Sequence, residues 1–180
     1  MRRKFFSETW PQCTKKLSSI CDFHRCAHCA HFSLHRREAG RPLRRFSCRI
    51  YGVLREGDRV LLTRSRFGED TFINFPGGGV ELEEAPGEAL LREFVEETGL
   101  VVRPVRTLYA SEACHLSTKH PIQIVSVYWL VERVSGELKL GGNGDDVVEL
   151  FWSEISALPC GEMFPAELEF AARLPALLTP

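Results

Sequence analysis

The sequence predicts an α+β fold in which a β-sheet packs against helices. Strand-like runs recur from residue 46 onward, one amphipathic helix lies in the middle of the chain, and an apolar helical segment lies near its end. At 180 residues, with 44% hydrophobic and 26% charged residues, the chain has room for one globular domain and an extension. No apolar run approaches the ~20 residues that cross a bilayer, so no membrane partner is expected.

Strand-like segments alternate with turn signals from residue 46 to residue 152. The expected strands are 46–54, 59–64, 71–75, 101–110, 122–132 and 147–152. Residues 55–58, Arg-Glu-Gly-Asp, have turn chemistry, so the first two strands should form a hairpin. The run 122–132 is almost continuously apolar, which is typical of a central strand buried on both faces.

The middle helix is predicted over about 85–98, because Pro86 suits a first helical turn and Gly99 suits the left-handed position that ends a helix. Arg92 lies four residues from both Glu88 and Glu96 and is expected to hold them. The apolar arc of this helix should consist of Leu90, Leu91, Phe94 and Val95.

Two further helical segments are expected after the last strand. Ser153 could cap a short helix that runs through Leu158. Residues 166–174 should form a C-terminal helix that docks through Leu168, Ala171, Ala172 and Leu174.

The charge changes sign near Arg45. Residues 1–45 carry a net charge of +8 and the rest of the chain −9, so we divide the chain into an extension, 1–45, and a domain, 46–180. The extension holds four of the seven cysteines and four of the six histidines. A flexible basic tail is the favoured interpretation; a zinc knuckle, an organelle transit peptide and a misassigned start are the alternatives.

The partners and compartment follow from composition. An odd number of cysteines without an export signal indicates reduced thiols and a cytoplasmic protein. The basic extension lacks an aromatic stacking platform, so a nucleic-acid partner is not expected. A homodimer is compatible with the sequence.

The stretch from Gly77 to Leu100 sets a glycine turn before the middle helix. Glycines allow the backbone to turn sharply and to approach a ligand closely. Glu93, Glu96 and Glu97 follow on the helix, and their spacing places them within one arc of roughly 100°. Like charges this close raise one another's pKa unless a cation takes up the field. A solvated acidic face is the alternative interpretation.

This stretch resembles the Nudix box, the signature of the Nudix hydrolase superfamily. The matching positions are Gly78, Glu84, Arg92, Glu93, Glu96, Glu97 and Gly99, with apolar residues at Phe94 and Leu100. One soft departure is Glu83, where many members carry glycine. The resemblance covers the chain from about Phe46 onward and excludes residues 1–45. It implies an α/β/α sandwich around a mixed β-sheet, with the acidic helix face exposed at the active site.

The resemblance also implies a metal-dependent site. Matching family positions assign the metal ligands to Glu93, Glu96 and Glu97, with the Gly78 carbonyl as a further ligand. Hard oxygen ligands suit Mg²⁺ or Mn²⁺, which screen phosphate charge and lower the pKa of the attacking water. Arg92 would orient the carboxylates, and Gly77, Gly78 and Glu84 would shape the turn that meets the substrate.

The general base stays open at this point. In this superfamily it can be a box glutamate or an acidic residue in a later loop. Here Asp145, Asp146 and Glu149 precede or begin the last strand, and Asp146 and Glu149 are candidates for the base or an auxiliary metal ligand. A solvated acidic loop is the alternative.

Other residues near the glycines have both a functional and a structural interpretation. His115 and His120 could contact phosphate or base, but a surface role is favoured. Phe67, Phe72 and Phe75 could stack on a nucleobase, although strand aromatics more often belong to a core.

The resemblance therefore implies a Mg²⁺-dependent pyrophosphohydrolase. Its substrate would be a nucleoside diphosphate linked to another moiety, such as a nucleoside triphosphate, a nucleotide sugar or ADP-ribose. The competing hypothesis is a non-catalytic module that senses a nucleotide. Loss of box carboxylates would favour sensing, and here all are present.

Overall fold

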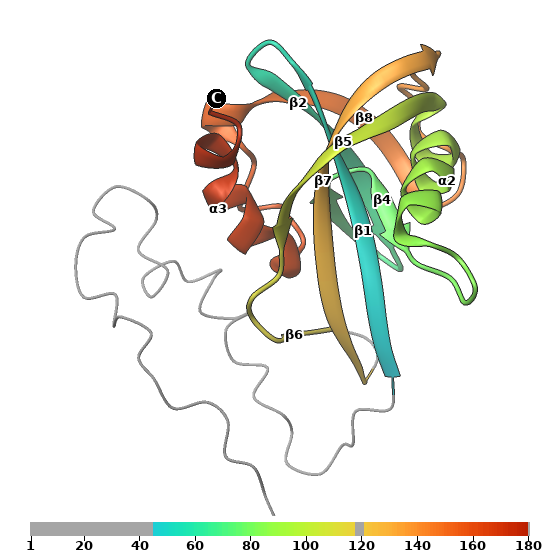
Figure 1. Ribbon diagram of the computed structural model, residues 1–180, viewed down its shortest axis with the longest axis vertical. Coiled ribbons are helices and arrows are strands. Elements are labelled where there is room, and N and C mark those ends of the chain that lie inside the picture. Colours follow the sequence, from blue (N-terminus) through green and yellow to red (C-terminus); the bar gives the residue numbers. More distant parts are fainter. Residues whose placement is uncertain (1–44, 118–120, 180) are drawn as a thin grey trace, which may run out of the picture. The chain divides into compact units, whose positions relative to one another are not determined.

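The computed structural model describes residues 45–117 and 121–179. The predictions for the Cys/His-rich extension and for His120 lie outside the described residues. The elements, in order, are β1 (Arg45–Glu56), β2 (Arg59–Phe67), β3 (Asp70–Asn74), β4 (Gly77–Gly79), α2 (Pro86–Thr98), β5 (Leu100–Ala110), β6 (His115–Leu116), β7 (Ile122–Gly136), β8 (Val147–Glu154), the 3₁₀ helices η1 (Ile155–Ala157) and η2 (Pro165–Glu167), and α3 (Leu168–Leu177), as Figure 1 shows.

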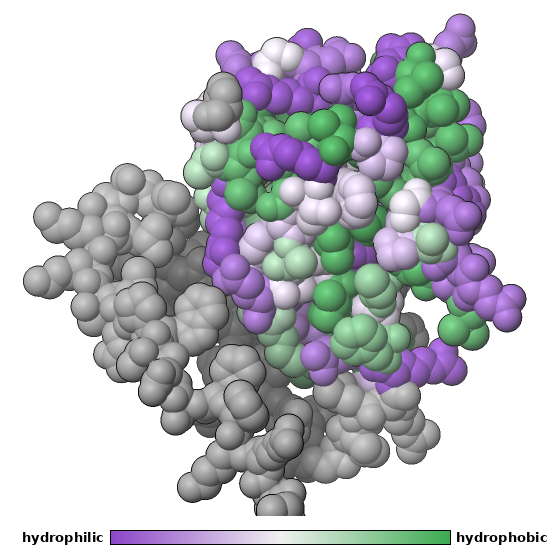
Figure 2. Space-filling model, in the orientation of Figure 1, coloured by the Kyte–Doolittle hydropathy of each residue, from purple (hydrophilic) through white to green (hydrophobic). Residues whose placement is uncertain are grey.

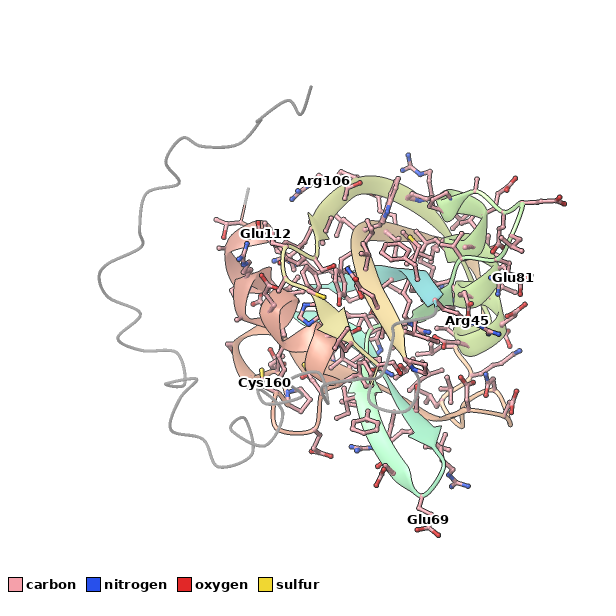
Figure 3. All side chains as sticks on the ribbon, turned by 90° about the horizontal axis from the view of Figure 1, so that it is seen from below. Arg45, Glu69, Glu81, Arg106, Glu112 and Cys160 are labelled. Carbon is pink, nitrogen blue, oxygen red and sulfur yellow. The ribbon has the colours of Figure 1, made fainter. Side chains whose placement is uncertain are left out.

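The strands form a mixed sheet. Its main path runs β3-β2-β1-β7-β5, while β4 pairs with β1, β6 with β7, and β8 with β2. The β1–β7 pair is parallel and the other pairs are antiparallel. The predicted hairpin is confirmed, because β1 and β2 pair directly on either side of the turn at Gly57 and Asp58. In Figure 3, Glu69 marks the tip of the β2–β3 hairpin.

The helices cover opposite faces of this sheet, which confirms the predicted α+β fold (Figure 1). One core lies under α2 and includes Ile50, Leu90 and Phe94. The other lies under α3 and includes Tyr51, Tyr128 and Phe170. Neighbours on β1 thus point to opposite sides, as the pleat of a strand requires. This alternation decides which β1 side chains can reach which helix.

Helix α2 begins and ends where its capping signals predict. Its first residue is Pro86, and Gly99 follows it with φ 75°, the left-handed conformation that glycine adopts without strain. The predicted apolar arc is wrong in part, because Leu91 is 38% and Val95 43% exposed. The apolar residues of α2 that are buried against the sheet are Ala89, Leu90 and Phe94.

The end of the chain departs from its prediction in detail. Ser153 lies in β8 rather than at a helix N-terminus, and a single 3₁₀ turn, η1, follows. Helix α3 begins after η2, at Leu168, and buries Phe170, Ala171 and Leu174. The predicted contact of Ala172 is wrong, since this residue is exposed.

The surface of the described residues shows no continuous apolar belt in the view of Figure 2, where hydrophobic residues are interspersed with hydrophilic ones. Within the described part of the chain, no helix is both long and apolar enough to cross a membrane.

Glu167 is a fully buried carboxylate in the core beneath α3. Its Oε2 accepts a hydrogen bond from the Phe75 amide at 3.5 Å, and its Oε1 has no partner. Burial raises the pKa of Glu167 to about 8, against the lowering effect of its hydrogen bonds and of Arg49. The titratable groups that face it are Arg49 and Tyr51 on β1 and Tyr128 on β7.

Substitution of Gly52 tests the packing of α2 on the sheet. A Cβ at this position would lie 2.4 Å from Cε2 of Phe94, so Gly52→Ala should lower the free energy of unfolding by about 1–3 kcal/mol. Gly87→Ala is the matched control, because nothing lies within 4 Å of its added Cβ, and it should leave stability unchanged or raise it by up to about 1 kcal/mol. Urea unfolding of both variants measures the difference, and equal stabilities would contradict this packing.

The raised pKa of Glu167 predicts that the stability of the protein depends on pH. Because its folded pKa lies above its value of 4.5 in the unfolded chain, its contribution is present below about pH 4.5 and is lost as the pH rises through about 8. Glu167→Gln should therefore reduce the loss of unfolding free energy across this window by on the order of a few kcal/mol. The exposed Glu132→Gln serves as control, and an unchanged slope in Glu167→Gln would disprove the assignment.

Candidate active site

Two carboxylates hold the loop between β4 and α2 by accepting hydrogen bonds from backbone N–H groups. Glu84 Oε2 accepts from the Glu81 amide at 3.0 Å, and Glu88 Oε2 accepts from the Ala85 amide at 2.9 Å, one residue before the helix. Glu83 has φ 67°, a left-handed conformation that favours glycine. The departure from the family pattern at this position therefore has a physical consequence, since the glutamate adopts a backbone conformation that glycine would adopt more readily.

Arg92 connects the loop and the helix through its guanidinium. Its Nε and Nη2 donate to both oxygens of Glu84 at 2.8 and 2.9 Å, and Nη2 also donates to the Gly79 carbonyl at 3.1 Å. Its Nη1 lies 3.0 Å from Glu93 Oε1 and 3.3 Å from Glu96 Oε2. The hydrogen bonds from Arg92 lower the pKa of Glu84 to about 2.

The predicted pairing of Arg92 with Glu88 is wrong, whereas its pairing with Glu96 is present. Glu88 instead caps the helix at the Ala85 amide. The guanidinium of Arg92 faces Glu84, because that carboxylate accepts hydrogen bonds from two guanidinium nitrogens at once.

Glu93 lies directly against β4. A Cβ at Gly78 would be 2.3 Å from Glu93 Oε1, so only glycine leaves room for this carboxylate. The side chain of Glu93 is 16% exposed. Burial raises its pKa above the usual value, and Arg92 opposes that shift.

Glu97 is buried, which corrects the expectation that it faces solvent. It is 6% exposed, and its Oε2 accepts a hydrogen bond from the Gly77 amide at 2.8 Å. Burial raises the pKa of Glu97 to about 8, the Gly77 amide opposes the shift, and the charges of Glu93 and Asp146 add to it. Helical spacing indicated the face of α2 on which Glu97 lies, but not that the glycine strand would cover it.

Asp146 comes close enough to the box to act on Glu97, whose pKa its charge raises. Its Oδ1 accepts from Asn143 Nδ2 at 3.0 Å, and its carbonyl accepts from the Arg66 amide. The side-chain oxygen of Asn143 also accepts hydrogen bonds from the backbone N–H groups of Asp145 and Val147, at 2.9 and 3.1 Å. Sequence reasoning missed Asn143, whose Asn-Gly-Asp-Asp context is the signal for such a turn.

Glu149 lies on β8 and pairs with Arg64 at 3.1 Å, and its side chain is 52% exposed. No contact joins it to the box carboxylates among the described residues. Its role as a metal ligand or base stays a prediction, with weaker geometric support than that of Asp146.

The histidine and aromatic candidates take structural positions. His115 Nε2 lies 3.4 Å from Glu169 Oε2 on α3. In Figure 3, Glu112 lies beside the same helix, where Arg173 pairs with both of its oxygens at 3.1 Å. Phe75 is fully buried and belongs to the core under α3. Phe72 is partly buried and packs edge-on against Phe164, and the side chain of Phe67 lies outside the described set.

The box residues suit a divalent cation by their chemistry. Burial raises the pKa of both Glu93 and Glu97, and a cation would favour their charged forms. All donors are hard oxygens, the ligands that Mg²⁺ and Mn²⁺ prefer. Within the described ranges no three acidic, histidine or cysteine side chains converge on a common point, because Glu93 and Glu96 are turned to Arg92 and Glu97 to Gly77.

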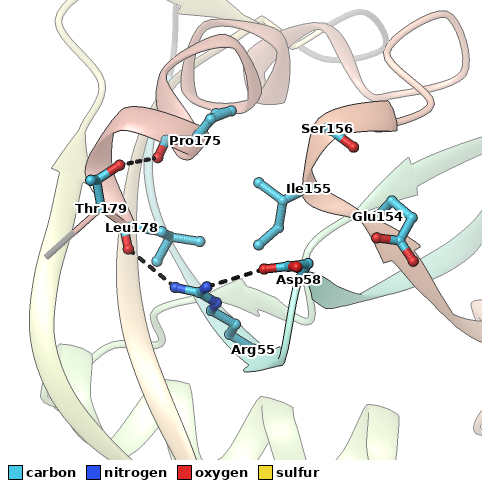
Figure 4. A pocket seen from close by; sticks show the side chains of 8 residues that line it. All are labelled: Arg55, Asp58, Glu154, Ile155, Ser156, Pro175, Leu178 and Thr179. Atoms are coloured by element: carbon cyan, nitrogen blue, oxygen red, sulfur yellow. Dashed lines mark hydrogen bonds and ion pairs between the residues drawn. The ribbon is translucent and has the colours of Figure 1, made fainter.

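A separate cavity of about 480 Å³ lies between the β1–β2 turn and the end of α3 (Figure 4). Its lining includes Arg55, Asp58, Ile155, Pro175 and Leu178, and no box residue. Arg55 donates to the Gly57 and Leu178 carbonyls at 2.6 and 3.1 Å and lies 3.5 Å from Asp58 Oδ1. The guanidinium of Arg55 is therefore already satisfied by protein oxygens.

Substitution of Gly78 tests the site without removing any polar group. Gly78→Ala would displace the Glu93 carboxylate, and a displacement of about 1 Å can reduce turnover about 100-fold. We expect this variant to lose hydrolysis and Mg²⁺-induced thermal stabilisation. Gly79→Ala is the matched control, with nothing within 4 Å of its added Cβ. Equal activities of the two variants would show that the position of Glu93 is unimportant.

Comparison with known proteins agrees with this geometry. The NUDIX domain family model matches residues 43–174. An 8-oxo-dGTP diphosphatase of Haemophilus influenzae is 35% identical over 127 residues, covering 68% of this chain and 87% of that protein. An ADP-ribose pyrophosphatase of Methanocaldococcus jannaschii is 30% identical over 116 residues, covering 61% of this chain and 63% of that protein.

A solved structure shares the fold of this chain. The crystal structure of a MutT NUDIX hydrolase from Burkholderia pseudomallei superposes with a TM-score of 0.61 at 24% identity, covering 74% of this chain and 98% of that one. This likeness concerns the fold alone, whereas the family match extends over almost all of the described residues. The chain therefore belongs to the Nudix family and is a hydrolase that acts on phosphoric anhydride bonds.

Proposed function

We propose that this protein is a Mg²⁺-dependent pyrophosphohydrolase that cleaves the diphosphate linkage of a nucleoside diphosphate derivative. The observation on which the proposal rests is that two carboxylates, those of Glu93 and Glu97, are shielded from solvent and contact β4, a strand that consists of glycines. Relatives named as 8-oxo-dGTP diphosphatase and ADP-ribose pyrophosphatase support a substrate of this class.

Glu93, Glu96 and Glu97 would hold the cation, with the Gly78 carbonyl and Asp146 as further oxygen donors. When bound, Mg²⁺ or Mn²⁺ screens the phosphate charge and lowers the pKa of a bound water. Glu93 and Glu96 would exchange part of their contact with Arg92 for contact with the cation. Arg92 keeps its two bonds to Glu84 and so fixes the loop while the carboxylates turn.

The proton of the attacking water would go to a nearby carboxylate. Asp146 is the stronger candidate outside the box, because it is exposed and its charge reaches Glu97. Glu93 and Glu96 are the candidates within the box, since both lie at the Arg92 guanidinium on the same helix face. A base needs only to be within hydrogen-bond reach of the water, directly or through one further water.

A substrate panel tests the reaction. With Mg²⁺ present, we expect release of a nucleoside monophosphate, or of pyrophosphate from a triphosphate, from at least one of ADP-ribose, nucleotide sugars, NADH, dinucleoside polyphosphates and normal or oxidised deoxynucleoside triphosphates. Chelation should abolish turnover. Glu97→Gln should lower kcat at least 100-fold while the far-UV circular dichroism stays native, because it removes a charged oxygen ligand.

The alternative, a nucleotide sensor without activity, would appear in the same experiment. In that case every compound would stay intact while calorimetry detected binding of one of them. Full activity of Glu97→Gln would remove this residue from the set of metal ligands.

A further inference from the structure

Arg49 is a charged residue on β1 at the level of the glycine strand. In the β1–β4 pairing it lies opposite Gly79, and the next two residues of β1 lie opposite Gly78 and Gly77. Arg49 shares the α3 side of the sheet with Tyr51, whereas the box helix covers the other side. Strand β4, which pairs with β1 at Arg49, contacts the box through Gly77 and Gly78; both of these glycines are buried, whereas Gly79 is partly exposed.

The guanidinium of Arg49 has hydrogen-bonding capacity that the protein leaves unused. Its Nε donates to the Tyr51 hydroxyl at 2.7 Å, and its terminal nitrogens form no hydrogen bond or ion pair with any described residue. The residue as a whole is partly buried. Arg92 and Arg55, in contrast, have both terminal nitrogens bound to protein oxygens.

Burial raises the pKa of Glu93, Glu97 and Glu167, and the positive charge of Arg49 opposes each of these shifts. Arg49 forms no ion pair with any carboxylate of the described residues. Arg49 lies on β1 beside the glycine strand, and its Nε is bound to Tyr51 of the core under α3. A guanidinium in this position, with two terminal nitrogens that no described residue binds, suits the paired oxygens of a phosphate.

We propose that Arg49 binds a phosphate group of the substrate through its two terminal nitrogens. This inference rests on the proposed function and assigns the phosphate contact to a residue outside the box. Arg92 cannot supply that contact without releasing Glu84 or Gly79. The ligand class is a diphosphate, one part of which faces the box carboxylates while another faces β1.

The competing role of Arg49 is to neutralise Glu167. Glu167 is fully buried, and the positive charge of Arg49 opposes the rise in its pKa that burial causes. Replacing Arg49 would leave this carboxylate uncompensated and could destabilise the protein without any effect on substrate. The test must therefore separate the two roles.

Calorimetric titration of the full chain with methylenediphosphonate, a pyrophosphate analogue that resists hydrolysis, measures the contact in the presence of Mg²⁺. Arg49→Met should weaken its affinity by roughly 10- to 100-fold, and Arg49→Lys should weaken it less, because lysine keeps the charge and loses the fork. Arg103→Met, an exposed change of the same charge on β5, should bind as the wild type does. An unchanged affinity of Arg49→Met, or no binding by the wild type, would overturn the proposal.

The double variant Arg49→Met/Glu167→Gln separates phosphate binding from neutralisation, since it removes the carboxylate that Arg49 would compensate. It should unfold at a higher temperature than Arg49→Met and still bind the analogue weakly. If its affinity instead returned to that of Glu167→Gln, Arg49 would have only a structural role. If Arg49→Met fails to fold, the double variant and Arg49→Lys carry the comparison.

Kinetics with any substrate that the panel identifies distinguishes this proposal from the proposed function. Arg49→Met should raise KM at least tenfold while the exposed control leaves KM and kcat unchanged. Wild-type hydrolysis together with normal kinetics of Arg49→Met would disprove the role of Arg49 alone. Absence of hydrolysis by the wild type would disprove the function, whatever the binding of the analogue.

Discussion

The hydrogen bond from the Gly77 amide to the buried Glu97 carboxylate joins the sheet to helix α2, and the geometry of the site depends on it. A carboxylate that is 6% exposed is stable only if its charge is compensated or its proton retained. The amide supplies part of that compensation. It also fixes the distance between β4 and α2, so that Glu93, one turn earlier on the helix, meets the backbone at Gly78.

Three arginines near the site have different roles. Arg92 joins the loop to the helix, and its hydrogen bonds go to residues of the box. Arg64, bound to Glu149 and Glu162, ties β8 and the segment before α3 to β2. Arg49 donates from Nε to Tyr51, and its terminal nitrogens form no hydrogen bond with the residues that the structure describes. An arginine that carboxylates contact directly therefore stabilises the fold, whereas an arginine without such contacts can bind a ligand.

The sequence predicted the frame of this site better than its interior. The limits of α2 followed from Pro86 and Gly99, whose backbone preferences are local and need no tertiary information. The acidic cluster followed from spacing. Burial could not be predicted in this way: Glu97 is covered by a strand twenty residues earlier, whereas the apolar Val95 is left exposed.

Residues whose importance depends on register escaped prediction altogether. Arg49 stands in an apolar strand and looks like a solvent-facing residue until the pairing of β1 with β4 places it beside the glycines. Glu167 follows a proline in a short segment without periodicity, and only the packing of η2 under the aromatic core shows that it is buried. Both cases need long-range pairing, which a local pattern does not encode.

The internal pairing of Arg92 has a consequence for how such a site can diversify. Because its guanidinium is satisfied by Glu84, Glu93, Glu96 and the Gly79 carbonyl, the box forms a nearly self-contained electrostatic unit. Changes in the strands and loops around it can alter what is recognised without disturbing that unit, whereas a change within it affects several partners at once. Relatives that are about one-third identical and are named for different substrates are consistent with this separation.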